Sequence, residues 1–102
     1  MTELLQTIQT MISSDTDDLD QIERTLTDGY AEALHLEAER SRLERQIAVM
    51  TQEIDRGDAA ENARELAVLA RRLDSSAGAL AKLRAVLGDL RRHASSIRGS
   101  DG

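Results

Sequence analysis

The chain has 102 residues, a net charge of −6 and no cysteine. The absence of cysteine excludes disulfides and thiolate metal sites, and the negative charge argues against a general affinity for nucleic acid. Its apolar residues are Leu, Ala, Ile, Val and Met, with Tyr30 as the single aromatic residue, and proline is absent. This composition favours long helices over strands, so we predict an all-α protein.

No window of the sequence approaches the roughly 18 apolar residues that span a bilayer. The first residues, MTELLQTIQTM, lack the basic stretch and apolar run of a secretory signal. We therefore expect a cytoplasmic protein that does not enter a membrane.

A short amphipathic helix is predicted over residues 2–12, where Leu4, Leu5, Ile8, Met11 and Ile12 share one side. The polar break that follows is crowded with helix-capping Ser, Thr and Asp, so residues 1–14 form a helix and linker. This segment contains no Lys or Arg to bind a membrane surface, and we expect it to dock against protein.

Two long helices are predicted next, over residues 17–56 and 59–97. Gly57 suits the left-handed residue that ends a helix, and Asp58 with Glu61 resembles a capping box. A turn this short forces the two helices to run antiparallel. We expect residues 15–98 to form a helical hairpin and residues 99–102 to fray.

Apolar residues recur alternately three and four positions apart in both long helices, which is the pattern of a coiled-coil seam. The seam positions of the first long helix are Leu19, Ile22, Leu26, Gly29, Ala33, Leu36, Arg40, Leu43, Ile47, Met50 and Ile54. Those of the second are Leu66, Leu69, Leu73, Ser76, Leu80, Leu83, Leu87, Leu90, Ala94 and Ile97.

The short turn sets the predicted pairing across this seam, which joins residues whose numbers sum to about 113. Gly29 then faces Leu83, and Glu23 approaches Arg91. The charge distribution supports the antiparallel arrangement, because residues 1–39 carry ten acids and one Arg, whereas residues 71–98 carry seven bases and two acids.

A second stripe of small residues suggests a groove that receives another helix. The stripe consists of Ala60, Ala63, Ala67, Ala70, Ala77 and Ala81, and the neighbouring helix offers Tyr30, Leu34, Ser41 and Ala48. Either the first helix folds back into this groove, or a second copy docks there and gives a four-helix bundle. Self-association is the favoured outcome, since a two-helix hairpin seldom suffices alone at this size. Together with Leu4, Leu5, Ile8 and Met11, this surface is the predicted partner-binding region.

The sequence lacks the motifs of catalysis. His35 and His93 are far apart in the predicted hairpin and cannot share a metal ion, and no metal-ligand, nucleophile–base or dinucleotide pattern occurs. We expect neither enzyme activity nor a metal or cofactor.

Arg40 conflicts with its seam position, because a buried charge there costs stability unless it is paired. The favoured interpretation is an ion pair with Glu37, Glu44 or Asp74. In the alternative, Arg40 and Ser76 form a central polar layer that fixes the register, or that binds an anionic ligand in a dimer together with Ser41 and Arg45.

The general plan is similar to small bacterial coiled-coil hairpins, including secretion chaperones and anti-sigma-type regulators, in architecture and not in motif. We therefore predict a non-catalytic adaptor or regulator that binds another protein through the Ala-lined groove and the first helix. The alternatives are a purely structural self-assembling coiled coil and a dimeric sensor of an anionic small ligand.

Overall fold

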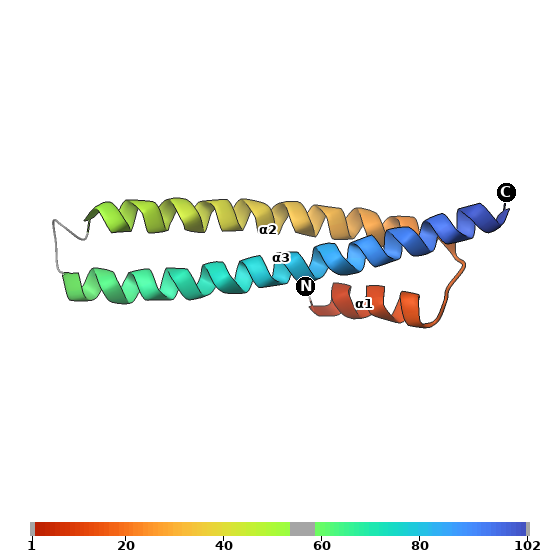
Figure 1. Ribbon diagram of the computed structural model, residues 1–102, viewed down its shortest axis with the longest axis horizontal. Helices are drawn as coiled ribbons and strands as arrows, with labels where there is room; N and C mark the ends of the chain where they lie inside the picture. Colours follow the sequence, from red (N-terminus) through yellow and green to blue (C-terminus); the bar gives the residue numbers. More distant parts are fainter. Residues whose placement is uncertain (1, 54–58, 102) are drawn as a thin grey trace. The chain divides into compact units, whose positions relative to one another are not determined.

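The computed structural model describes residues 2–53 and 59–101, and every element in these ranges is an α-helix (Figure 1). The helices are α1 (Thr2–Ser13), α2 (Leu19–Glu53) and α3 (Ala59–Asp101). The predicted all-α class is confirmed. None of the helices described is both long and apolar enough to cross a membrane. The predicted turn at Gly57, its capping residue Asp58 and the last seam residue Ile54 lie outside the described residues.

The chain leaves α1 through a C-terminal cap in which Asp15 takes the left-handed position, with φ 52°. The amide of Thr16 donates to the carbonyl of Met11 at 3.3 Å, and that of Asp15 donates to the carbonyl of Ile12 at 3.2 Å. These two bonds form a Schellman motif, which satisfies carbonyl groups at the end of the helix.

Asp18 is the N-cap of α2. Its Oδ1 accepts a hydrogen bond from the amide of Gln21 at 3.2 Å, and its carbonyl oxygen accepts one from the amide of Ile22 at 3.0 Å. Such a cap satisfies an otherwise unpaired amide in the first turn. The helix therefore begins at Leu19, slightly later than the predicted residue 17.

The far end of α3 lies beyond the predicted position near residue 97. The helix continues through Gly99 to Asp101. Gly99 does not adopt a positive φ and the chain contains no proline, so neither of the usual helix stops operates here.

The described residues form two compact units, and each long helix contributes to both. The three-helix unit comprises residues 2–34 and 81–101, and the two-helix unit comprises residues 35–53 and 59–80.

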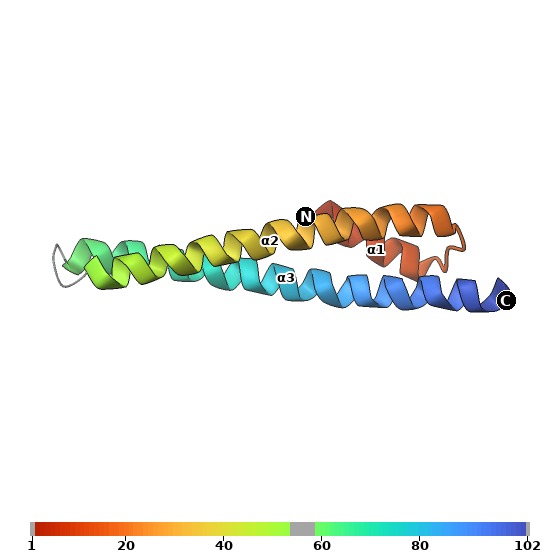
Figure 2. The same cartoon turned by 90° about the horizontal axis from the view of Figure 1, so that it is seen from above.

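The three-helix unit has a closed core. α1 packs against the N-terminal part of α2 and the C-terminal part of α3 (Figures 1 and 2). Ile8 of α1, Ile22 of α2, and Leu83 and Leu90 of α3 are fully buried. The first helix therefore supplies a core side chain to its own chain.

The register within this unit differs from the prediction. A Cβ atom at Gly29 would lie 2.3 Å from Cδ2 of Leu87, so Leu87 is the residue nearest to Gly29, where the prediction placed Leu83. Glu23 pairs with Arg98 and not with Arg91. The numbers 29 and 87 sum to 116, and at this sum Ile22 faces Ala94, which is also a seam residue. The pairing at Gly29 is thus displaced by about one helical turn along α3 from the predicted one.

In the two-helix unit, α2 and α3 run side by side in opposite directions (Figures 1 and 2). The buried residues here are Leu36, Leu43, Ser76 and Leu80. The other apolar seam residues, Ile47, Met50, Leu66, Leu69 and Leu73, are only half-buried. Two helices alone leave both flanks of a seam open to solvent, so this unit lacks a closed core.

Candidate functional site

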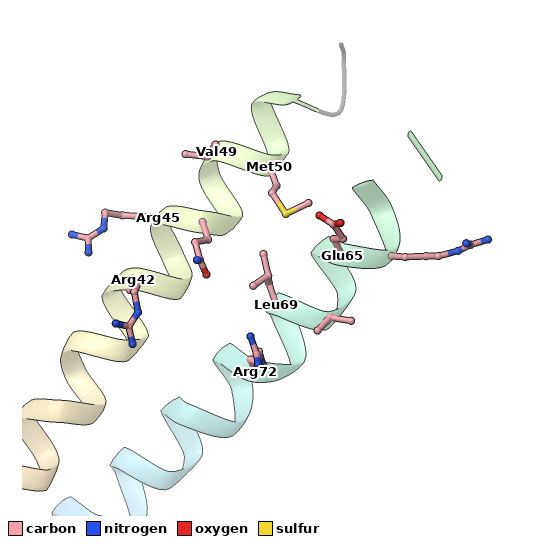
Figure 3. Close-up of a pocket in the computed structure, with 10 residues that line it drawn as sticks. Arg42, Arg45, Val49, Met50, Glu65, Leu69 and Arg72 are labelled. Carbon is pink, nitrogen blue, oxygen red and sulfur yellow. The ribbon is translucent and has the colours of Figure 1, made fainter. Parts of the chain in front are cut away.

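A groove of about 700 Å³ opens on the two-helix unit, between the C-terminal part of α2 and the N-terminal part of α3 (Figure 3). Val49 and Met50 line it from α2, and Val68 and Leu69 line it from α3. Val49 is 53% exposed and Val68 is 46% exposed. Both valines are therefore large apolar side chains left about half in solvent along one groove.

The helix positions explain why these valines are exposed. Met50 and Leu69 are seam residues, and Val49 and Val68 each precede a seam residue by one position, on the same flank of the seam between the two antiparallel helices of this unit. Figure 3 shows the side chains of Met50 and Leu69 pointing into the space between the helices. A third helix on this flank would cover both valines, and within this unit there is none.

Arginine dominates the charged residues along this groove. Arg42, Arg45, Arg64 and Arg72 line it, with Glu65 as the one acidic residue among its lining side chains. None of these four arginines forms an ion pair within the described ranges 2–53 and 59–101. The rim therefore carries a local positive charge on a chain whose net charge is −6.

A second hollow of about 440 Å³ continues the first, since Val68 and Arg72 line both. Its other lining residues are Leu36, Glu39, Arg71, Ser75 and Ser76. The hydroxyl of Ser76 is buried and has no hydrogen-bond partner among the residues that the structure describes. We call the two hollows together the arginine-rimmed groove. Along α3 its lining runs from Arg64 to Ser76.

Arg40 and Ser76, the predicted central polar layer, behave differently from each other. The Arg40 side chain is 47% exposed, and its Nε donates to Oε1 of Glu44 at 3.0 Å. This is one of the ion pairs expected for a seam arginine that turns toward solvent. Ser41 is exposed, and Arg45 lines the groove. The hydroxyl of Ser76 makes no hydrogen bond to Arg40.

The predicted partner surface is partly exposed and partly buried. Of its members, Ala63, Ala67, Ala70, Ala81, Tyr30 and Leu34 are exposed, Ala77, Leu4 and Leu5 are half-buried, and Ile8 and Met11 are buried. Within the three-helix unit, α1 leaves Tyr30, Leu34 and Ala81 exposed. The first helix therefore packs away from these residues, on another side of the unit.

His93 anchors the segment that joins α1 to α2. Its Nε2 lies 2.7 Å from the carbonyl oxygen of Thr16, and its Nδ1 lies 3.7 Å from Oδ1 of Asp15. His35 is exposed. Within the described ranges, no group of three or more His, Cys, Asp or Glu side chains is placed to hold a metal ion.

Sequence reasoning missed the arginine-rimmed groove because it followed small residues along α3 and not the valines. A usable signal was present: Val49 and Val68 are apolar residues outside both the seam and the alanine stripe, and each is followed by an apolar seam residue. No known protein family, curated protein or solved structure matches the chain.

Proposed function

We propose that this protein is a non-catalytic helical interaction module, an adaptor or regulator, whose arginine-rimmed groove receives a helix of a partner protein. The observation that carries the proposal is the exposure of Val49 and Val68 beside half-buried Met50 and Leu69. The lining of the groove follows α3 from Arg64 to Ser76, an extended shape that suits a helix, whereas small-molecule sites enclose most of their ligand.

A docked helix would gain apolar contact at several points. Full burial of a valine, leucine or methionine side chain contributes about 1.5–3 kcal/mol. Val49 and Val68 are each about half exposed, so covering both contributes about 2 kcal/mol in total. Covering the exposed parts of Met50 and Leu69 adds to this binding free energy. The sum is comparable to the contribution of a hot-spot residue in a protein–protein interface.

The proposal takes α2 and α3 as one antiparallel hairpin in a cytoplasmic protein. The side-by-side packing of the two helices within each unit supports the hairpin. A four-helix bundle formed by two copies is the alternative assembly, and it differs from the proposal in the molar mass of the purified protein.

Site-specific photo-crosslinking tests the groove, because the chain has no cysteine and a single introduced thiol can be labelled cleanly. The test variant is Val68→Cys, labelled with a photoreactive group. The matched control is Ala70→Cys, which is also exposed and lies about 160° away around the helix, at 3.6 residues per turn. Both labelled chains are irradiated in the extract of their source cells.

We expect one defined adduct from position 68, absent from position 70, and lost when Val49→Asp is added to Val68→Cys. An equal adduct from position 70 would place the interface on the alanine stripe. The absence of an adduct at both positions would contradict the proposed function.

A further inference from the structure

We infer that the helix received by the arginine-rimmed groove is acidic and amphipathic, and that it belongs to a different protein. This inference rests on the proposed function, and it adds the chemistry of the partner. The groove is lined by five arginines (Arg42, Arg45, Arg64, Arg71 and Arg72) and two glutamates, Glu39 and Glu65. A positively charged rim around an apolar floor matches a helix with one apolar stripe flanked by Asp and Glu.

The arginines lie on both helices, so they flank a docked helix on its two sides. Arg42 and Arg45 belong to α2, whereas Arg72 belongs to α3 (Figure 3). Arg64 also belongs to α3 and precedes Arg72 by about two turns. Acidic residues on either flank of the partner's apolar stripe would meet them. Because the described residues offer these four side chains no ion pair, docking breaks no existing pair to form the new ones.

The length of the groove sets the length of the partner segment. Its lining on α3 extends from Arg64 to Ser76, which corresponds to about 18 Å at 1.5 Å per residue. A helix of about three to four turns fills such a groove. The apolar contacts would be spaced at i, i+3 or i+4, and i+7.

A second copy of the chain is a poor occupant for electrostatic reasons. A two-fold contact brings the same patch of both copies together, which would place arginine-rich rims against each other. Like charges across an interface cost affinity. The chain's own α1 is unsuitable as well, because Ile8 is already fully buried in the three-helix unit and Glu3 is the only acid of that helix.

The test uses the full chain and two synthetic helical peptides of about two heptads, which matches the length of the groove. Both peptides carry Leu at the seam positions, and they differ only in having Glu or Lys at the flanking positions. Fluorescence anisotropy measures the dissociation constant of each. We expect the Glu peptide to bind at least about tenfold more tightly than the Lys peptide, with an affinity that falls as salt screens the charges.

Three variants locate the binding. Arg72→Glu should weaken the Glu peptide several-fold, and Val68→Asp should abolish its binding. Arg91→Glu makes the same change of net charge at an exposed position in the three-helix unit, and it should leave binding unchanged. If Arg72→Glu and Arg91→Glu weaken binding of the Glu peptide equally, the effect comes from the net charge of the chain and not from the groove. That result would overturn the inference.

The remaining outcomes separate this inference from the proposed function. If the Lys peptide binds as tightly as the Glu peptide, the groove receives helices but the acidic chemistry is wrong. If the position-68 adduct forms while neither peptide binds, the inference fails and the proposed function stands. If light scattering shows a dimer that Val68→Asp dissociates, the occupant is a second copy and the inference is overturned.

Discussion

Replacing Gly29 with alanine tests the register of the three-helix unit. A Cβ atom at this position lies 2.3 Å from Cδ2 and 3.2 Å from Cγ of Leu87, whose side chain is 3% exposed. Inside a helix, alanine is favoured over glycine by about 1 kcal/mol, whereas forcing an extra methyl into a packed core costs about 1–3 kcal/mol. We expect Gly29→Ala to lower the free energy of unfolding by about 1 kcal/mol, within a range of about 0–2.

Gly78→Ala is the matched control. Gly78 also lies inside α3, but no atom approaches within 4 Å of a Cβ built there. Only the helix-propensity gain remains, so this variant should be stabilised by about 1 kcal/mol. The two variants should therefore differ by about 2 kcal/mol in urea denaturation, where the midpoint and slope give the free energy of unfolding.

A double-mutant cycle identifies the residue that opposes Gly29. Leu87→Ala alone should cost about 2–5 kcal/mol. Adding Gly29→Ala to it should then stabilise the protein, because the truncated side chain leaves room for the new methyl group. This gives a favourable coupling of about 2 kcal/mol between positions 29 and 87. Coupling to Leu83→Ala in its place would refute the observed register, and a stabilising Gly29→Ala variant would refute the close contact.

Three further substitutions test the core and the cap by thermal or urea denaturation. Ile8→Ala removes a fully buried side chain of α1 and should cost about 2–4 kcal/mol; a loss below about 0.5 kcal/mol would mean that α1 does not pack there. Asp18→Ala removes the bond to the Gln21 amide and should cost about 1 kcal/mol, whereas Asp18→Asn should retain most of the stability. Ser76→Ala removes a buried hydroxyl that has no partner within residues 2–53 and 59–101, and it should be neutral or stabilising by up to about 1 kcal/mol, in contrast to the usual loss for a hydrogen-bonded group.

The buried side of the helices was predictable from sequence. Alternate spacings of three and four identified Ile22, Leu43, Leu80 and Leu90 as seam residues, and all four are buried. This spacing follows from the burial of one apolar stripe on each helix. It therefore does not depend on which element covers that stripe. The capping role expected of the residues before α2 is likewise local, since Asp18 bonds to the amide three residues on.

The register of α2 against α3 in the three-helix unit was harder to predict from sequence. A heptad pattern does not distinguish between alignments that differ by about one helical turn. Leu83 and Leu87 are both seam leucines, and either suits a position opposite Gly29 on volume alone. The side chains that decide between them, including the long Arg98 that reaches Glu23, act through contacts that spacing does not reveal.

The groove was missed although the lengths of the helices already point to it. That helix has 12 residues and spans about 18 Å, whereas the 35 residues of α2 span about 52 Å. A helix of this length supplies a third layer to only part of the longer one. The flanks of the two-helix unit, where Val49 and Val68 lie, are left without such a layer.

This difference between the units predicts how a partner would change local stability. Two-helix segments without a closed core are marginal, so amides of residues 35–53 should exchange with solvent faster than those near fully buried Ile22. A helix bound at 100 times its dissociation constant stabilises the bound state by about 2.7 kcal/mol. With the Glu peptide at that concentration, hydrogen exchange should slow by up to about a hundredfold in residues 35–53 and 59–80, and little in residues 19–34. Equal slowing in both units would show that the chain opens as one cooperative body, and that the two-helix unit is not a separately stabilised docking element.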